Sequence, residues 1–375
     1  MHKTFKYRIY PSKAQARKLD ATLALCCELY NAALQERRDA WRMSRTSINY
    51  HAQAIQLPEI KTTRPELGMV HSQVLQETLK RLDKAFDAFF RRLENGEQPG
   101  FPRFRSRARY DSMTYPQTGF GIEHGKLRLS KIGKVKVKLH RPLEGGIKTL
   151  TVRRSATGKW FACFAVECQP EPLPVATEVT GVDMGLKEFA VLSNGEPIAN
   201  PKFFRVGEKR LAKAQKKLSP AAKVSPERSK RRKVVAQIHE RIANKRRNFA
   251  HQESRKLVNR FTIIVFEKLN IRGMLKNPCL AKSISDAAWN QFVQCTTYKA
   301  ANAGRCAVQV DPRNTSRLCS GCGQLVEKDL SVRLHDCPGC GLRLDRDHNA
   351  AINILRLGLQ SLGVPCAPAI EAPSY

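Results

Sequence analysis

Two cysteine pairs, each followed by glycine, limit more than any other feature how this chain can fold. The first pair is Cys319 and Cys322, in CSGCG; fourteen residues later comes the second pair, Cys337 and Cys340, in CPGCG. Two such turns present four thiolates tetrahedrally, which is how proteins hold structural zinc. Because protein fills all four positions, we expect one structural Zn²⁺ without a catalytic role. His335 lies between the pairs and is not needed as a ligand.

The sequence around these cysteines predicts a particular order of strands and helices. Three short strand patterns lie between residues 177 and 199, and helical patterns follow over 203–260, broken near 219–225. FTIIVFE then predicts a buried strand, 285–302 a helix, CAVQVDP another strand, and 347–357 a last helix after the cysteine module. This is the element order of an RNase H-like nuclease fold with a zinc ribbon inserted before the last helix.

Three acidic residues occupy positions that would converge in such a fold. Asp183 lies in the strand GVDMG, Glu267 ends the strand IIVFE, and Asp347 begins the last helix. A buried acid is costly unless it is paired or binds a cation, and three carboxylates suit Mg²⁺ or Mn²⁺. Two such ions could activate a water and stabilise the leaving oxygen of a phosphodiester. Asp345 competes as third ligand, but we expect it to be a helper or an N-terminal cap.

The charge balance indicates a polyanionic partner. The 375-residue chain has 66 Lys and Arg against 33 Asp and Glu, a formal net charge of +33. Between residues 201 and 260 the imbalance is 20 to 4, too one-sided for a helix face stabilised by ion pairs. We therefore predict that 201–260 is a hairpin that binds nucleic acid.

The first half of the chain predicts strands with an inserted group of helices. Residues 1–11 alternate like a strand, 12–45 and 70–93 have helical spacing, and 112–168 contains several strand patterns separated by glycine turns. A small β-barrel or curled sheet would result. Between helices and strands lies GFPRFRSRAR, whose Arg103 and Arg105 are candidate nucleic-acid contacts among aromatic residues. The tail from Gln360 is rich in Pro and Ala, and we expect it to be loose.

No segment predicts insertion into a membrane. The N-terminal residues alternate rather than forming a signal-peptide core, and no apolar run approaches the roughly 20 residues needed to span a bilayer. We expect a cytoplasmic bacterial protein, associated with the nucleoid when bound to DNA. In that reducing compartment the eight remaining cysteines are expected to be small buried side chains rather than disulfides.

Several blocks resemble TnpB, the RNA-guided endonuclease family of insertion-sequence transposons (OrfB), which is related to compact type V CRISPR effectors. The resemblance covers nearly the whole chain. The blocks are FKYRIYPSKAQ, HSQVLQETLKRLDKAF, GFPRFRSR, MTYPQ, GVDMGLKEFAVLSNG, FEKLNIRGM, NTSRLCSGCG and DRDHNAAINI. It implies a guide RNA from the transposon end, cleavage of double-stranded and single-stranded target DNA, and a monomer on its RNA.

The resemblance also implies a domain plan and site residues. Asp183, Glu267 and Asp347 would form a RuvC-type triad. Residues 1–11 and 96–170 would be a barrel-like wedge domain and 12–95 a helical recognition lobe. Residues 171–311 and 343–358 would be the RuvC-like nuclease domain, 312–342 the zinc ribbon and 359–375 a flexible tail. A short DNA motif beside the target would be read by Tyr50, Ser72, Gln73, Gln76 and Thr114.

Three alternatives remain open from the sequence. A nuclease-inactive RNA-guided repressor would bind DNA without cutting it, and the three intact acids argue against that. A DNA transposase could use the same fold, but no separate helix-turn-helix DNA-binding domain is evident. A protein-only nuclease would differ in needing no copurifying RNA.

Overall fold

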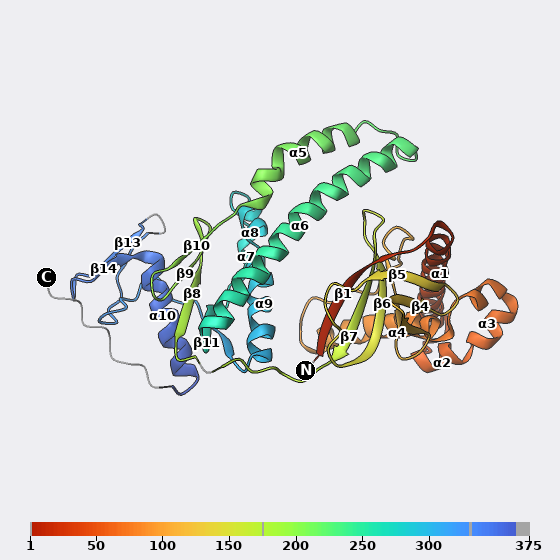
Figure 1. Ribbon diagram of the computed structural model, residues 1–375, viewed down its shortest axis with the longest axis horizontal. Helices are drawn as coiled ribbons and strands as arrows, with labels where there is room; N and C mark the ends of the chain where they lie inside the picture. Colours follow the sequence, from red (N-terminus) through yellow and green to blue (C-terminus); the bar gives the residue numbers. More distant parts are fainter. Residues whose placement is uncertain (1, 175, 330–331, 365–375) are drawn as a thin grey trace. The chain divides into compact units, whose positions relative to one another are not determined.

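The computed structural model describes residues 2–174, 176–329 and 332–364. The chain divides into two compact units, Met1–Gln169 and Pro170–Tyr375 (Figure 1). Among the described residues, no helix is both long enough and apolar enough to cross a membrane.

The first unit contains a curled seven-stranded antiparallel sheet. Its spatial order is β2-β6-β7-β1-β5-β4-β3. The two edge strands approach each other, since the rings of Tyr115 on β2 and Phe120 on β3 are 6.4 Å apart. The sheet is therefore a nearly closed barrel. Its strands are β1 (His2–Tyr10), β2 (Ser112–Tyr115), β3 (Phe120–Glu123), β4 (Lys126–Leu129), β5 (Gly133–Lys138), β6 (Gly146–Arg154) and β7 (Trp160–Glu167).

Helices inserted after β1 share one apolar core with this barrel. The first begins with a capping box, in which Ser12 and Gln15 each bond the other's backbone N–H. Between the two predicted helices, residues 50–69 fold into short helices, the first capped by the side chain of Asn49. The helices are α1 (Lys13–Ser44), α2 (Tyr50–Ile55), α3 (Leu57–Thr63), a 3₁₀ turn (Pro65–Met69) and α4 (Ser72–Glu94).

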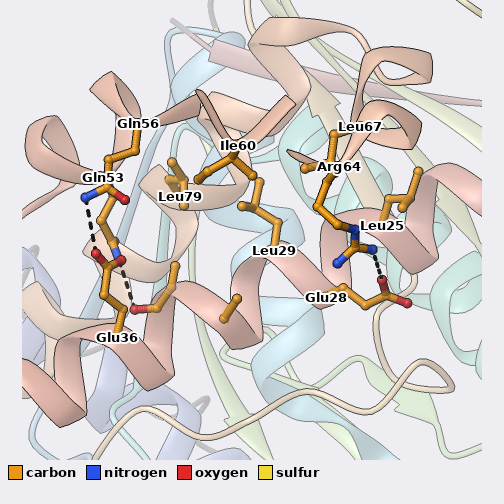
Figure 2. Close-up of a pocket in the computed structure, with 12 residues that line it drawn as sticks. Leu25, Glu28, Leu29, Glu36, Gln53, Gln56, Ile60, Arg64, Leu67 and Leu79 are labelled. Atoms are coloured by element: carbon orange, nitrogen blue, oxygen red, sulfur yellow. Dashed lines mark hydrogen bonds and ion pairs between the residues drawn. The ribbon is translucent and has the colours of Figure 1, made fainter. Parts of the chain in front are cut away.

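A cavity of about 290 Å³ lies among these helices. Figure 2 shows Leu29, Ile60 and Leu79 along its apolar middle. At one end Glu36 accepts hydrogen bonds from Gln53 and Gln56, and at the other Glu28 pairs with Arg64. The cavity belongs to the first unit, whereas the three predicted catalytic acids belong to the second.

The second unit is built on a five-stranded mixed sheet of order β10-β9-β8-β11-β12. Strands β8, β11 and β12 are parallel, while β9 and β10 are antiparallel to their neighbours. The strands are β8 (Val179–Met184), β9 (Glu188–Leu192), β10 (Pro197–Ala199), β11 (Ile263–Glu267) and β12 (Cys306–Val310).

The helix expected over 285–302 is instead two helices, because Ala288 has the left-handed backbone conformation, with φ of 55°. α8 (Ala281–Ala287) ends there and α9 (Trp289–Asn302) begins. A short helix, α7 (Ile271–Met274), precedes them. α9 packs against α6 and buries Trp289 and Phe292 in the core of this unit.

The basic segment forms a helical hairpin, α5 (Phe203–Leu218) and α6 (Pro226–Arg260) (Figure 1). A small apolar cluster around Leu211, Ile238 and Ile242 holds its two helices together. Exposed positions near the turn include Lys223, Lys230, Arg232 and Lys233. The apolar cluster lies between the two helices, and the basic side chains of the hairpin therefore remain exposed to solvent.

The last described helix is α10 (Arg346–Ser361), which runs past the expected end at Leu357 and buries Leu359. It packs across β8, β9, β11 and β12. Two glycines permit this approach: a Cβ at Gly181 would overlap the carbonyl oxygen of Ala351, and one at Gly358 would overlap the side chain of Val265. The rest of the predicted loose tail, 365–375, lies outside the described residues.

Candidate functional site

The three predicted acids lie at one end of the second unit's sheet. Asp183 is near the carboxyl end of β8, and Glu267 is the last residue of the neighbouring parallel strand β11. Asp347 is in the first turn of α10, which crosses β8. The chain turn after β8 is close to it, since a Cβ at Gly185 would lie 4.0 Å from Asp347 Oδ2. Three segments far apart in sequence thus supply one cluster of carboxylates.

Burial and mutual repulsion disfavour ionisation of these acids. Burial raises the pKa of Asp183 well above its ordinary value, and the nearby charges of Glu267 and Asp347 raise it further. The pKa values of Glu267 and Asp347 are also raised, first by burial. A bound cation would relieve both causes, because it supplies opposite charge where water is excluded. The oxygen-rich donor set fits a divalent cation.

Two neighbouring side chains hold the acids in place. Glu267 is buried, and its Oε1 lies 2.7 Å from the hydroxyl of Thr315, which donates to it and lowers its pKa. Asp347 faces the guanidinium of Arg333, whose Nη1 lies 3.4 Å from both carboxylate oxygens. Neither Thr315 nor Arg333 is predictable from the sequence, because both lie in the cysteine module and approach the acids only in three dimensions.

Asp345 is the N-terminal cap of α10. Its Oδ1 accepts hydrogen bonds from the backbone N–H groups of Asp347 and His348. This confirms the cap role expected for Asp345. Its negative charge still contributes to raising the pKa of Asp347.

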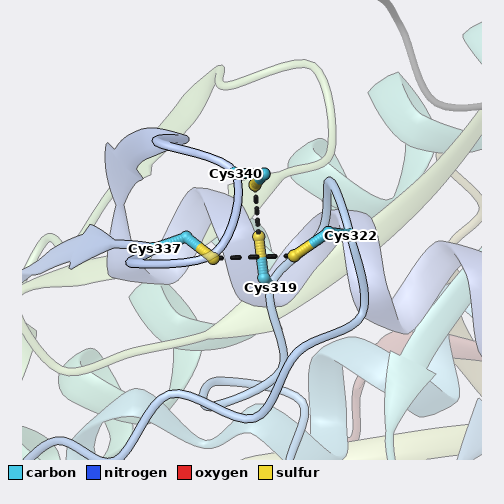
Figure 3. A group of neighbouring side chains, drawn as sticks. All are labelled: Cys319, Cys322, Cys337 and Cys340. Atoms are coloured by element: carbon cyan, nitrogen blue, oxygen red, sulfur yellow. Dashed lines mark hydrogen bonds between the residues drawn. The ribbon is translucent and has the colours of Figure 1, made fainter.

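The four module cysteines come together as a single cluster (Figure 3). Their sulfurs all lie within 4.8 Å of one another, with Cys319 and Cys340 at 3.6 Å and Cys322 and Cys337 also at 3.6 Å. Gly323 and Gly341 follow the two pairs with φ of 77° and 72°, a conformation that favours glycine and closes each turn. Four converging thiolates can hold a structural metal ion.

Buried amides fasten the cysteine module to α10. Asn349 accepts a bond from the N–H of Ser320 and donates to the carbonyl of Leu318; Asn353 donates to the carbonyls of Leu318 and Thr315. The sequence carried a signal that was missed. Two asparagines four residues apart stand within the apolar stripe of a helix, where a polar side chain requires a partner.

The candidate readers of a DNA motif are spread over the first unit. Ser72, Gln73 and Gln76 lie in the first two turns of α4. Ser72 accepts from Lys61, Gln73 accepts from the backbone and hydroxyl of Thr118, and Gln76 is exposed. Tyr50 begins α2 and packs on the core, while the Thr114 hydroxyl bonds that of Thr151. Ser72 and Gln76 are therefore the exposed members of this group.

Arg103 and Arg105 are exposed in the segment after α4. The backbone of Arg105 is held by Asn31 of α1, which both donates to its carbonyl and accepts from its N–H. The guanidinium of Arg105 lies over the ring of Tyr30 at 6.0 Å. The segment is thus fixed to α1 without regular secondary structure.

Three family models match this mixed α/β chain. They are the "Cas12f1-like, TNB domain" over 289–354, the "Probable transposase" family of IS605 OrfB over 163–278, and a "Helix-turn-helix domain" of the same family over 1–46. The description of the last model differs from our expectation that no separate helix-turn-helix DNA-binding domain is evident. In the structure, however, its described residues form β1 and the single long helix α1.

Relatives match over nearly the whole length. A Streptomyces pristinaespiralis protein named as an RNA-guided DNA endonuclease is 38% identical, over 95% of this chain and 89% of its own length. InsQ of Escherichia coli, named likewise, is 29% identical over 94% and 92%. The solved structure of the endonuclease Cas_phi3 matches with a TM-score of 0.49 and 9% identity, over 98% of this chain and 93% of that one. The sequence relatives show that this chain belongs to the TnpB (OrfB) family.

Proposed function

We propose that this protein is an RNA-guided DNA endonuclease that hydrolyses phosphodiester bonds with divalent metal at Asp183, Glu267 and Asp347. The observation that carries the proposal is the convergence of these acids at one end of the sheet, in a chain whose full-length relatives are named for this activity. Its partners are a guide RNA derived from the transposon end and target DNA.

The topology of the second unit supports an RNase H-like, RuvC-type assignment. The order β10-β9-β8-β11-β12, with β9 antiparallel, places the first strand of the unit at the centre beside the fourth. Asp183 and Glu267 then lie at adjacent strand ends, where α10 adds Asp347. We assign 171–311 and 343–358 to the nuclease domain and 312–342 to the ribbon. The first unit holds the barrel-like wedge, 1–11 and 96–170, and the helical recognition lobe, 12–95.

The three carboxylates would hold Mg²⁺ or Mn²⁺, which would supply an activated water and stabilise the leaving oxygen. The chain's own contribution is to position the ligands. Thr315 orients Glu267, and the cap at Asp345 fixes the first turn of α10. The positive charge of Arg333 partly neutralises the carboxylate of Asp347 and so reduces its repulsion by the other two acids. Buried carboxylates that repel each other without a cation are suited to bind one.

The cysteine cluster would hold Zn²⁺. Sulfurs on a tetrahedral zinc at about 2.3 Å are about 3.8 Å apart, close to the 3.6 Å between Cys319 and Cys340 and between Cys322 and Cys337. The ion would be structural, and the hydrogen bonds of Asn349 and Asn353 would hold α10 against the ordered module. The basic hairpin α5–α6 would contact the phosphates of the bound nucleic acid.

The main competing function is strand transfer, because one matching family model is described as a "Probable transposase". A transposase of this fold could use the same three acids. The two full-length relatives are instead named for RNA-guided cleavage. Among the residues that the structure describes, no contact favours strand transfer over hydrolysis.

The decisive experiment is purification of the chain from cells that also carry the flanking transposon DNA, followed by sequencing of the RNA that copurifies. A discrete RNA from the element's end should appear, and its variable end defines a matched DNA target. The complex should cut that target and spare a mismatched one, while Asp183→Asn should bind both RNA and target without cutting. Cleavage that ignores the RNA sequence would contradict the proposal.

A further inference from the structure

Six aromatic residues form a partly exposed surface near the C-terminal ends of α1 and α4 and in the segment that follows α4. They are Trp41, Phe86, Phe89, Phe90, Phe101 and Phe104, called here the aromatic surface. Phe101 lies edge-on to Phe86 at 5.6 Å and to Phe89 at 5.4 Å, and Phe90 stacks on Phe86 at 6.4 Å. Phe86 anchors the group to the core, while Phe90 is 54% and Phe101 47% exposed.

Arginines lie on these rings from α1. The guanidinium of Arg37 is 5.2 Å from the ring of Phe86, and that of its neighbour Arg38 is 5.3 Å from Phe104. One helical turn beyond Arg37 stands Trp41, which is 54% exposed and has Arg45 over its ring at 5.7 Å. Ring contacts thus join Phe86, Phe89, Phe90 and Phe101, and residues of one stretch of α1 lie on Phe86 and Phe104 and carry Trp41. Arg37 is itself buried and ion-paired with Asp83, whereas Arg38 and Arg45 are exposed and lie beside exposed rings.

We propose that the aromatic surface is a stacking platform for unpaired nucleotides of the RNA that this protein carries. Every base has a π face, so aromatic rings bind single strands without reading their sequence, while the exposed Arg38 and Arg45 meet the phosphates. The proposal rests on the proposed function only in naming the RNA as the source of the nucleotides. It adds a binding site in the first unit, separate from the three carboxylates.

Charge and exposure favour this occupant over the alternatives. A second copy of the chain would bring arginines against arginines and add another net charge of +33. Open aromatic rings favour a partner that covers them permanently. A guide RNA is held before any target arrives, whereas a displaced DNA strand is present only during cutting. The RNA is therefore the partner that best accounts for the exposed rings of the aromatic surface.

Trp41 provides a direct probe of the platform. The chain has three tryptophans, of which Trp160 and Trp289 are buried at 4% and 2% exposure. Iodide should therefore quench mainly Trp41 in the full-length protein stripped of nucleic acid. An unstructured oligoadenylate RNA should quench this emission and protect it from iodide. Trp41→Phe should abolish the signal while leaving the fold intact, and no RNA-dependent change in Trp41 emission would overturn the proposal.

Variants then separate stacking from charge and from protein contact. Phe90→Leu with Phe101→Leu keeps apolar bulk but removes two ring faces, and should weaken oligoadenylate binding about five-fold or more. The dependence of affinity on salt should not change, because no charge is lost. Ile55→Ala, at a site 78% exposed on α2, is the control that should bind normally. Unchanged affinity in the double variant with retained melting temperature would overturn the platform.

The identity of the occupant is tested in the assembled complex. Photocrosslinking of 4-thiouridine-substituted guide RNA should join it to peptides containing Phe90, Phe101 or Trp41. Crosslinks at these peptides from the displaced DNA strand instead would overturn the assignment to RNA. So would concentration-dependent dimerisation that the leucine variant abolishes. The oligoadenylate measurements use neither guide nor cleavage, so failure of guided cutting would not alter their outcome.

Discussion

The hydroxyl of Thr315 lies 2.7 Å from Oε1 of Glu267. Thr315 belongs to the segment entering the cysteine module, and Glu267 ends a central strand of the sheet. The module thus touches the carboxylate site directly. Asn353 holds the backbone carbonyl of the same threonine, so α10, the module and β11 meet at one residue.

Replacing Thr315 should shift the pH dependence of cleavage. The Thr315 hydrogen bond lowers the pKa of Glu267, and Thr315→Val removes it, so the pKa should rise and metal binding should require higher pH. We expect cleavage at neutral pH to fall about ten-fold, consistent with losing a hydrogen bond to a charged group. Thr315→Ser should behave as wild type. Superimposable pH–rate profiles for all three proteins at fixed Mg²⁺ would refute this role.

Asp183→Asn should abolish cleavage and flatten the pH dependence of metal-free stability. Burial, Glu267 and Asp347 raise the folded-state pKa of Asp183 above its unfolded value. Its contribution to the free energy of unfolding is therefore full below the ordinary aspartate pKa and is lost as pH rises through the raised pKa. Asparagine does not ionise, so the variant does not lose this part of its free energy of unfolding. Urea unfolding in EDTA across pH should show wild type losing more stability than the variant as pH rises.

Gly181→Ala should separate α10 from the sheet. The added methyl would overlap the carbonyl of Ala351 and lie 2.6 Å from the backbone nitrogen of Leu355, and backbone cannot move aside cheaply. We expect a loss of about 1–3 kcal/mol in the free energy of unfolding, with cleavage lost because Asp347 moves. Gly146→Ala has open space around its Cβ and is the control. Equal stabilities of the two variants would contradict this packing.

Cys322→Ser should remove zinc and lower the melting temperature of the second unit. Three thiolates bind zinc less tightly than four, and the module's fold depends on the ion. Elemental analysis should find one zinc per wild-type chain and less in the variant. Cys279→Ser changes an exposed cysteine outside the cluster and should keep its zinc. Full zinc content in Cys322→Ser would exclude it as a ligand.

Charge removal on the hairpin should reduce the salt dependence of nucleic-acid binding. Lys230→Gln and Arg232→Gln each remove an exposed charge on α6. Each should lower the slope of log affinity against log salt by about one. Lys230→Arg and Arg232→Lys preserve charge and should leave the slope unchanged. Slopes that do not differ between the glutamine and charge-preserving variants would exclude these residues as phosphate contacts.

Much of the architecture was predictable because local patterns and core burial agree. The strands β8, β11 and β12 are short apolar runs, and α1 and α4 have strong apolar stripes, so their existence followed from periodicity. The break at Ala288 was not predictable, because alanine favours a continuous helix and neither glycine nor proline marks this point in the sequence. The extension of α10 to Ser361 also depends on tertiary burial, here of Leu359.

The acids and cysteines of the candidate site were predictable from the sequence. The side chains that contact the acids were not. Asp183 and Glu267 stand out because acids are rare within buried strands, and the cysteines stand out by spacing. Thr315 and Arg333 carry no such signal. Threonine and arginine are common in loops, and their value lies in reaching Glu267 and Asp347 from a module whose placement the sequence does not specify.

The close seating of α10 against Gly181 and Gly358 has a consequence for how the protein is made. Asp183 and Glu267 are synthesised before the cysteine module, and Asp347 only after it. A nascent chain therefore has two carboxylates and no complete cation site. Under the proposed function, all three carboxylates are needed, so a truncated product that ends before α10 is expected not to cut DNA.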